Sequence, residues 1–406
     1  MNLHLVTDNV FTEGFMDFVE EINELGKNEF VVYHSPDAES NGKMKYLSRP
    51  CRYIPSHHNT TFSEQITGRL GKYKKVFIHY LDDSLFDMVL DCDKNVELNW
   101  VLWGLDYYGP EDFFMNLIFD PLTKKYITSQ PTYNRIPFPK NPFNIPRYIT
   151  ASGKLRAQRK IYLESYMPRK KRVIARINNI CSYLKPDYDF VVENYGARAM
   201  YKPLYYTMFG EGDFVCDSKK TNDIMRALGL EGKRTIYCGH SGSLYLNQID
   251  QIPALSQLLN GQKDTVAVFG LAYGLPRYID YITKLAEKNL GTAFFPVTKF
   301  MSKPDYNHFL NGIDVVIMNQ NVNVAGTNIF ILLYLGKKVY LKRSQVFNKF
   351  FTSKGVKLFN IEDIAGKTLD EVMEPLSNED QLNNKKIIGE IFSKKQAITN
   401  LKQILN

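Results

Sequence analysis

Two short loops in the second half of the chain have the composition of phosphate-binding turns. Gly239-His240-Ser241-Gly242 follows an apolar run of strand length and precedes a helical stretch. Residues 323–328, Asn-Val-Ala-Gly-Thr-Asn, lie in the same context about 85 residues later. Glycines let a backbone approach a phosphate, and the N–H groups and dipole of a helix N-terminus attract it. Two such turns at one sheet edge suit a diphosphate with a nucleoside attached, although the first loop alone is also typical of a tight turn.

Further candidates for binding such a nucleoside diphosphate, as the donor of a transferred group, lie between these loops. Phe269-Gly270 ends the intervening strand, where backbone groups are candidates for reading a base. Tyr273 is a candidate for stacking on the base or touching a phosphate, and a surface aromatic side chain is the alternative. The spacing of the first loop fits neither a Walker loop nor the dinucleotide fingerprint. The predicted donor-binding residues are Gly239, His240, Ser241, Gly242, Gly270, Tyr273, Gly326, Thr327 and Asn328.

Candidates for binding the molecule that accepts the transferred group, and for taking a proton from its hydroxyl, lie in the first half of the chain. Residues 100–109 hold both tryptophans of the chain and supply flat rings of the kind that hold sugars. Asp106 is a candidate general base or hydroxyl ligand, with a structural cap as the alternative. His79, at the end of another predicted strand, is a substitute base or a buried structural imidazole. The predicted catalytic residues are Asp106 and His79, and the predicted acceptor-binding residues are Asp8, Trp103, Gly104 and Tyr108.

No group of residues has the spacing of a metal site. Asp82-Asp83 is too common a pair in loops to indicate a metal, and His57-His58 has no partner at a suitable distance in the sequence. The five cysteines are odd in number and scattered, which is typical of reduced thiols in a cytosolic protein. We therefore expect neither a metal nor a cofactor.

The elements that must position these side chains follow an alternating pattern. In the second half, apolar runs of strand length alternate with amphipathic helices, which predicts βαβ units, a parallel sheet and ligands at the carboxyl edge of that sheet. The first half repeats the pattern less cleanly. The predicted strands are 2–6, 30–33, 74–80, 98–103, 235–238, 265–269, 292–295, 314–318 and 338–341. The predicted helices are about 15–25, 252–259, 277–288, 305–310 and 327–335.

A chain of 406 residues is too long for one core, so two α/β domains are expected. The N-terminal domain is placed at 1–205, the C-terminal domain at 206–385, with the hinge near 205–232, and a helix at 386–406 packs back across them. Six of the chain's 18 prolines fall within 120–147. This density favours a long extended loop, an insertion at about 110–150 in the N-terminal domain.

The net charge of +8 indicates an anionic partner. Nine basic residues and one acid lie between Lys154 and Arg176, interleaved with apolar and aromatic residues. This pattern favours a helix on an anionic membrane, and a solvated basic helix is the alternative. The predicted membrane contacts are Arg169, Lys170, Lys171 and Arg172. The start of the chain indicates a buried strand instead of a signal peptide, no run of about 20 apolar residues could span a bilayer, and no nucleic-acid motif is present.

Three of these motifs, in order along the chain, resemble the TDP-N-acetylfucosamine:lipid II N-acetylfucosaminyltransferase family of enterobacterial common antigen synthesis. The family's Trp-Gly-x-Asp-x-Tyr segment is matched by Trp103 to Tyr108, and its Gly-Asn-Ser-Gly loop by Gly239 to Gly242. Its late Gly-Thr before an apolar helix is matched at Gly326-Thr327, with residues 335–339 in register. The stretches 153–176 and 183–206 also resemble the part of the family's sequence that leads up to the connection between its two domains.

The chain departs from the family at several positions. His240 stands where the family has Asn, and the turn that follows is about three residues longer. The family's Asn-x-His therefore falls near Asn247 or Asp250-Gln251, and its His is absent. The proline-rich segment at 120–150 resembles an insertion. These changes bear on the donor sugar and the acceptor more than on the reaction class.

The resemblance implies a GT-B glycosyltransferase. Two Rossmann-like domains would face each other across a cleft, with a TDP- or UDP-linked donor on the C-terminal domain and a lipid-linked, undecaprenyl-diphosphate acceptor on the N-terminal one. It also implies a metal-independent enzyme that works in the cytoplasm, peripherally on the inner face of a bacterial plasma membrane, in surface polysaccharide synthesis. The alternatives are a sugar-nucleotide epimerase on the same fold and a non-catalytic protein that binds anions or nucleic acid. Retention or inversion of the anomer does not follow from these residues.

Overall fold

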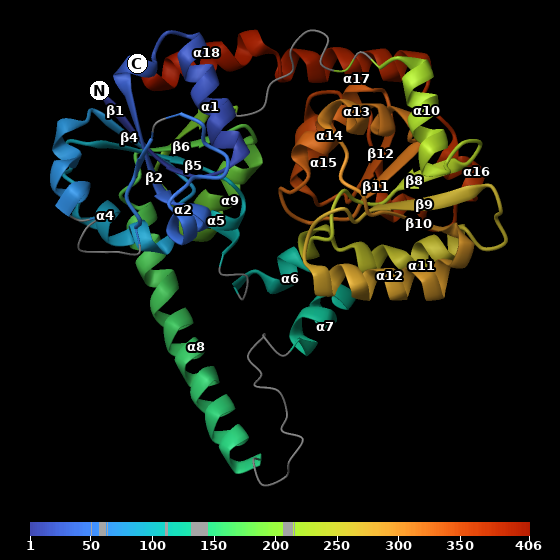
Figure 1. Ribbon diagram of the computed structural model, residues 1–406, viewed down its shortest axis with the longest axis horizontal. Coiled ribbons are helices and arrows are strands. Elements are labelled where there is room, and N and C mark those ends of the chain that lie inside the picture. The colour runs from blue at the N-terminus through green and yellow to red at the C-terminus, as the bar shows by residue number, and fades with distance from the viewer. Residues whose placement is uncertain are drawn as a thin grey trace. The chain divides into compact units, whose positions relative to one another are not determined.

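The computed structural model describes residues 1–49, 51–56, 62, 64–109, 113–130, 145–205, 214 and 216–406, without the side chains of residues 10, 36, 37, 41 and 145–159. The chain divides into two compact units (Figure 1). The first comprises Met1–Gly109, Ser129–Met208 and Lys394–Asn406, and the second Pro110–Thr128 and Phe209–Ser393. Each is built on a parallel sheet, so the predicted pair of Rossmann-like α/β domains is confirmed.

The sheet of the first unit has the strand order β3-β2-β1-β4-β5-β6-β7, and each neighbouring pair is parallel. β1 and β4 are buried along nearly their whole length because their apolar runs are covered on both faces. The strands are β1 (Asn2–Thr7), β2 (Asn28–His34), β3 (Arg52–Tyr53), β4 (Lys75–His79), β5 (Glu97–Val101), β6 (Asn179–Ser182) and β7 (Met200–Pro203).

The helices of the first unit cover this sheet. They are α1 (Val10–Glu21), α2 (Pro36–Asn41), α4 (Phe86–Asp91), α5 (Leu105–Tyr108), α8 (Ile145–Ile174), α9 (Lys185–Tyr195) and α18 (Lys394–Leu405). α1 begins five residues before the predicted start, because the side chain of Asn9 accepts hydrogen bonds from the backbone N–H groups of Phe11 and Thr12. The end of the chain packs here as well: Leu401 and Ile404 of α18 join Phe15 and Val19 of α1 in one buried cluster.

The sheet of the second unit has the order β10-β9-β8-β11-β12-β13, again with parallel pairs. Its strands are β8 (Arg234–Tyr237), β9 (Thr265–Gly270), β10 (Phe294–Val297), β11 (Val315–Met318), β12 (Lys338–Leu341) and β13 (Phe359–Asn360). The chain order reverses between β10 and β11, so right-handed crossovers put α11 and α12 on one face and α13 and α14 on the other (Figure 1). Ligands bind at such a reversal in open α/β sheets, outside the carboxyl ends of the strands.

The helices of the second unit are α6 (Met115–Ile118), α7 (Pro121–Ser129), α10 (Ser218–Leu228), α11 (Gln248–Leu258), α12 (Pro276–Leu290), α13 (Lys303–Gly312), α14 (Gly326–Tyr334), α15 (Val346–Ser353), α16 (Leu369–Met373) and α17 (Asn378–Ile391). Two predicted elements begin at other residues than expected. α11 begins at Gln248 instead of residue 252, so Pro253 lies inside the helix. Residues 291–293 form a 3-10 turn, and β10 therefore begins at Phe294.

The segment that carries α6 and α7 corrects the predicted proline-rich loop. It belongs to the second unit, although it lies within the first half of the sequence. Residues 121–129 are helical, because Pro121 occupies the first helical position, where a missing N–H costs nothing. α8 likewise begins at Ile145, with Pro146 in its first turn. The rest of the predicted loop, residues 131–144, lies outside the described residues.

Polar contacts hold this segment on the second unit. The Asp250 carboxylate accepts hydrogen bonds from the backbone N–H groups of Leu122 at 2.7 Å and Thr123 at 2.9 Å. Asp120 forms an ion pair with Lys342, the residue that follows β12. Both groups of that pair are largely buried, so each needs the other's charge as a partner in the folded unit.

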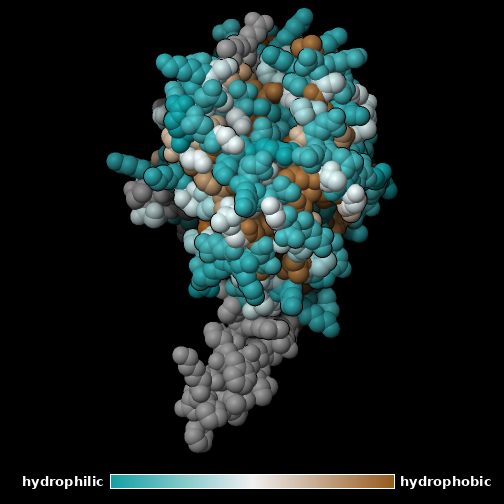
Figure 2. All heavy atoms as spheres, turned by 90° about the vertical axis from the view of Figure 1, so that its right-hand side faces the viewer, coloured by the Kyte–Doolittle hydropathy of each residue, from teal (hydrophilic) through white to brown (hydrophobic). Residues whose placement is uncertain are grey.

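The surface is predominantly polar on the face that Figure 2 shows, where hydrophobic atoms gather only in small patches. A few large hydrophobic side chains of the molecule are strongly exposed, among them Phe300 at 82%, Leu382 at 68% and Ile161 at 65%. Scattered exposure of this kind is ordinary for a folded protein.

Among the helices of the described residues, none has the length and apolar character needed to cross a bilayer.

Candidate functional site

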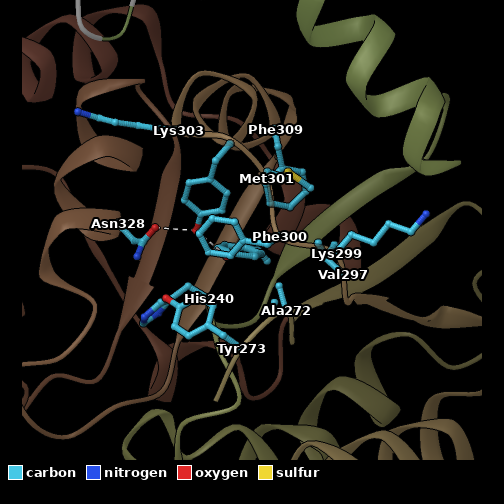
Figure 3. Close-up of a pocket in the computed structure, with 13 residues that line it drawn as sticks. His240, Ala272, Tyr273, Val297, Lys299, Phe300, Met301, Lys303, Phe309 and Asn328 are labelled. Carbon is cyan, nitrogen blue, oxygen red and sulfur yellow. Dashed lines mark hydrogen bonds between the residues drawn. The ribbon is translucent and has the colours of Figure 1, made fainter. Parts of the chain in front are cut away.

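A cavity of about 330 Å³ opens at the carboxyl edge of the second sheet (Figure 3). Its floor comes from the ends of β8, β9 and β10, and its sides from the start of α13 and α14. Its size is within the range of small-molecule sites. It is lined by Tyr237, His240, Gly270, Ala272, Tyr273, Val297, Lys299, Phe300, Met301, Lys303, Tyr306, Phe309 and Asn328.

Two loops beside this cavity are locked together through glycines. The backbone N–H of Gly242 donates to Tyr273 O at 2.8 Å, and that of Leu275 donates to Gly242 O at 3.0 Å. A Cβ on Gly274, whose φ is +130°, would lie 2.4 Å from Gly242 O. A Cβ on Gly270 would lie 2.7 Å from the carbonyl carbon of His240. The close approach of the two loops therefore accounts for these glycines, and the side chain of His240 extends into the cavity.

A line of hydroxyl and amide groups crosses the cavity wall. The hydroxyls of Tyr237 and Tyr306 lie 2.9 Å apart, and the Tyr306 hydroxyl donates to Asn328 Oδ1 at 2.7 Å. Burial raises the pKa of both tyrosines, so both phenols stay protonated. Because the carbonyl oxygen of Asn328 is held by Tyr306, its amide nitrogen is turned away from that contact and remains a donor beside the cavity (Figure 3).

The electrostatics of the cavity favour an anion. Lys299 and Lys303 line it, and none of the described residues in its lining carries a carboxylate. Lys303 is the first residue of α13, where the helix N-terminus adds positive potential. Neither lysine forms an ion pair with another described residue. In Figure 3 the two side chains leave the cavity rim in opposite directions, so their ammonium groups add positive potential around its mouth.

Aromatic rings supply the apolar part of the wall. Tyr273 is 50% exposed and Phe300 82% exposed, and their ring centroids lie 6.3 Å apart in an edge-to-face arrangement. Burial on one side raises the pKa of Tyr273, opposed by the nearby hydroxyl of Ser241. Exposed ring faces at the mouth of a cavity are typical of sites that stack a planar base.

The structure brings part of the predicted donor set together. His240, Gly270, Tyr273 and Asn328 line the cavity. Gly239, Ser241 and Gly242 form the loop behind His240, and Gly326 and Thr327 form the first turn of α14 just before Asn328. Sequence reasoning missed the residues that β10 and α13 contribute, namely Lys299, Phe300, Lys303 and Tyr306. The available signal was two lysines between a predicted strand and the next helix.

The residues of this chain near the family's Asn-x-His position, Asn247 and Asp250, contact the segment that carries α6 and α7. Asn247 has a left-handed backbone with φ +50°, and its side chain donates to Ile118 O and accepts from Asp120 N. Asp250 caps α7, as described above. These residues bind the α6–α7 segment, so they do not line the cavity.

In the first unit, Asp106 holds its own loop. Its carboxylate accepts hydrogen bonds from Trp100 Nε1 at 2.8 Å, Trp103 N at 3.0 Å and Leu81 N at 3.3 Å, and only 3% of the residue is exposed. Burial raises its pKa, and the three hydrogen bonds oppose that rise. Between the two roles that the sequence left open, this geometry favours the structural cap.

His79 is equally enclosed. It is 1% exposed, and its Nε2 lies 2.9 Å from Nδ1 of His4, whose Nε2 lies 3.0 Å from Asn28 Oδ1. Burial lowers the pKa of His79 well below its ordinary value and that of His4 to about 4, so both rings are neutral. The pair packs among Phe15, Phe30 and Phe77. This placement favours the structural imidazole of the two alternatives.

The remaining predicted acceptor residues are divided between surface and core. Burial would raise the pKa of Asp8, but hydrogen bonds from the Ser35 hydroxyl and from the backbone of residues 45–47 outweigh it, and the pKa is lowered. Tyr108 is buried at 2% exposure. Trp103 is partly exposed, 5.5 Å from the ring of Phe11, beside Gly104 with its φ of +103°. Trp103 is thus the predicted acceptor side chain best placed to meet a ligand.

The predicted membrane residues differ in exposure, and the prediction for Lys170 is wrong. Lys170 is fully buried, and its Nζ donates to Asp106 O at 2.7 Å and to Gly109 O at 2.6 Å. It lies on the side of α8 that faces the unit, so it cannot touch a membrane. Arg169 pairs with Asp87 at 2.5 Å, while Lys171 and Arg172 are exposed.

In the described parts of the chain, no group of three or more His, Cys, Asp or Glu side chains is placed to hold a metal ion.

No protein-family model and no curated protein matches the chain in sequence. Among solved structures it is similar to Anabaena HepE in complex with UDP-glucose, with 11% identity, 100% of this chain and 98% of that chain covered, and a TM-score of 0.65. It is similar to WaaG, a glycosyltransferase involved in lipopolysaccharide biosynthesis, with 10% identity, 100% and 98% coverage, and a TM-score of 0.56. The Staphylococcus aureus MnaA–UDP structure matches at 13% identity, 100% and 96% coverage, and a TM-score of 0.51. At such identities the likeness shows the fold: two Rossmann-like domains of the GT-B type, over the whole chain.

Proposed function

We propose that this protein is a glycosyltransferase that binds a nucleoside-diphosphate sugar, TDP- or UDP-linked, in the cavity of its second unit. The observation that carries the proposal is the composition of that cavity. It combines exposed aromatic faces, two lysines and a helix N-terminus, and the described lining contains no carboxylate. A nucleoside diphosphate is a ligand that needs both a stacking surface and cations. That HepE and MnaA, which share the fold, were solved with UDP-glucose or UDP supports the same ligand class here.

Each part of such a donor has a counterpart in the cavity. Tyr273 and Phe300 offer ring faces to a base, and stacking on an aromatic side chain contributes about 1–3 kcal/mol per base. Lys299, Lys303 and the N-terminus of α14 would neutralise the diphosphate. The same groups would stabilise the leaving diphosphate when the anomeric C–O bond breaks and both electrons remain on its oxygen.

We place the acceptor on the first unit and propose that it is lipid-linked, in bacterial surface polysaccharide synthesis. Trp103 and Phe11 form a partly exposed aromatic pair at the carboxyl edge of that unit's sheet. α8 exposes Ile161 and Tyr162 close to basic residues, which is the pattern of a helix that lies on an anionic membrane. Asp106 would then keep Trp103 in position and leave the acceptor's proton to another group. The transferred sugar would be a deoxy or acetamido sugar, as the resemblance implies.

Calorimetry with UDP, TDP and a single-stranded oligonucleotide tests the ligand class directly. We expect saturable binding of a nucleoside diphosphate and none of the oligonucleotide at physiological salt. A second assay follows sugar transfer from a nucleotide sugar to an undecaprenyl-diphosphate-linked glycan. Binding of the oligonucleotide alone would overturn the proposal. Conversion of the nucleotide sugar without any acceptor would establish the epimerase alternative instead.

A further inference from the structure

His240 is held rigidly where the first glycine loop meets the cavity. Its backbone is trapped against Gly270, where an added Cβ would lie 2.7–2.8 Å from the backbone atoms of His240. Gly239, with a φ of +102°, precedes it. The imidazole therefore enters the cavity from a fixed Cα, beside Tyr273 and opposite Asn328 (Figure 3). Its ring centroid lies 6.0 Å from that of Tyr273.

The imidazole has an unused nitrogen. Nδ1 of His240 is buried and has no hydrogen-bond partner among the described residues. A buried polar atom without a partner is costly in a folded protein, and such groups are often completed by a ligand. Because nothing in the described chain fixes its tautomer, the ring can present a donor to a ligand.

The groups that face His240 carry positive charge or none. The titratable groups of the lining are Tyr237 from β8, Tyr273 from the loop after β9, Lys299 from the loop after β10, and Lys303 and Tyr306 from α13. α14 contributes the neutral Asn328, and α11 contributes the neutral Gln248, which packs on Gly239. Burial lowers the pKa of His240 to about 4, so the ring is neutral at pH 7 in the free protein.

A diphosphate would reverse this balance. A negative charge within hydrogen-bonding distance favours the protonated form of an imidazole, so the pKa of His240 would rise when an anion occupies the cavity. An amide side chain at this position could donate a hydrogen bond but could not titrate. His240 therefore adds a proton-linked step that an Asn would lack.

We propose that His240 takes up a proton when the nucleotide sugar binds and, as an imidazolium, donates a hydrogen bond to the diphosphate. The inference rests on the proposed function and concerns the same cavity. When the bond between the anomeric carbon and the phosphate oxygen breaks, the electron pair stays on the oxygen, and the imidazolium stabilises the charge that develops there. The acceptor oxygen forms the new bond to carbon and releases its own proton to solvent water. When the nucleoside diphosphate departs, His240 returns its proton to water.

The test is calorimetry on the full chain with UDP-glucose and TDP-glucose as probes. These diphosphate diesters do not titrate near pH 7, so any proton taken up on binding is taken up by the protein. Titrations at pH 7 in two buffers of different ionisation enthalpy report the number of protons taken up. We expect a net uptake on binding, and an affinity that falls as pH rises from 6 to 8, by at most about tenfold per unit for one proton.

The matched variants are His240→Asn and His34→Asn. His240→Asn should still bind, without proton uptake and without the pH dependence. His34 has an exposed side chain in the other unit, so its variant should behave like the wild type. Binding without proton uptake in the wild type, or unchanged uptake in His240→Asn, overturns the inference and leaves the proposed function standing. If neither probe binds the wild type, the proposed function and this inference both fall. The wild-type measurement keeps the inference testable even if the variant does not fold.

Discussion

The buried ammonium of Lys170 lies 2.7 Å from the backbone carbonyl oxygen of Asp106, and this contact ties α8 to the loop that carries Trp103. The same Nζ reaches Gly109 O at 2.6 Å. A charge that is almost wholly enclosed and bonded to two carbonyls belongs to the framework of the unit. The helix that exposes a basic face to solvent is thus anchored beneath the candidate acceptor loop.

Replacing Lys170 with Met should destabilise the first unit. The change leaves two buried carbonyl groups without their donor, at a cost of about 1–3 kcal/mol each. Chemical denaturation of wild type and variant measures the difference in the free energy of unfolding. Lys171→Met, at the exposed neighbouring position, should have almost no effect. Equal stability of the two variants would show that the Lys170 contacts contribute nothing.

The contribution of Lys170 should also depend on pH. Burial lowers its pKa to about 8 in the folded protein, from 10.5 when exposed. Between these values the unfolded chain binds more protons, so the wild type should gain free energy of unfolding relative to Lys170→Met as pH rises from 8 to 10. Denaturation curves of both proteins across this range measure the change. A difference that stays constant would contradict the lowered pKa.

Loss of either cavity lysine should weaken nucleotide binding. Lys299→Gln and Lys303→Gln each remove one of the two lysine cations in the described lining, and a hydrogen bond to a charged group is worth about 1.5–3 kcal/mol. Calorimetry with UDP or TDP should show roughly 10- to 100-fold weaker binding. Lys284→Gln is the control, because Lys284 is exposed on α12 and pairs with Asp280. Wild-type affinity in both cavity variants would exclude this cavity as the diphosphate site.

Asp106→Asn separates the two roles of this residue. An Asn amide places a donor against at least one of the groups that now donate to the carboxylate. We therefore expect the free energy of unfolding to fall by roughly 1–3 kcal/mol, with a lower melting temperature. Turnover per folded molecule and nucleotide affinity should stay near wild type. A loss of two to four powers of ten in turnover with unchanged melting would restore the general-base role.

Membrane binding should depend on Lys171 and Arg172 and not on Lys170. Each exposed cation near an anionic surface contributes about 1 kcal/mol, so Lys171→Gln with Arg172→Gln should reduce binding to anionic vesicles by roughly tenfold or more. Higher salt should have the same effect on the wild type. Lys385→Gln with Lys386→Gln, on α17 of the other unit, gives the matched loss of charge. Equal binding of the wild type to neutral and anionic vesicles would remove the membrane from the proposal.

Much of the architecture followed from local patterns in the sequence. Apolar runs of strand length placed β1, β4, β8, β9, β11 and β12 nearly where they lie, because strands covered on both faces need such runs whatever surrounds them. The loops after β8 and β11 could be predicted as well, because each contains glycine between an apolar strand and a helix. His240, Gly270, Tyr273 and Asn328 then met at one edge, as parallel strands require.

Other features were decided by contacts between distant segments. The sequence predicted a loop at Pro121, whereas the structure has a helix there, and Asp250, more than a hundred residues away, caps its first turn. Nothing near Lys170 indicates burial, since its neighbours Arg169, Lys171 and Arg172 have the same charge, and the side it faces depends on how α8 docks on the unit. Asp106 and His79 have side chains suited to catalysis, and only the burial around them favours the structural alternative for each. Residue type determines what a side chain can do, whereas accessibility and partners arise from segments that meet only in the folded chain.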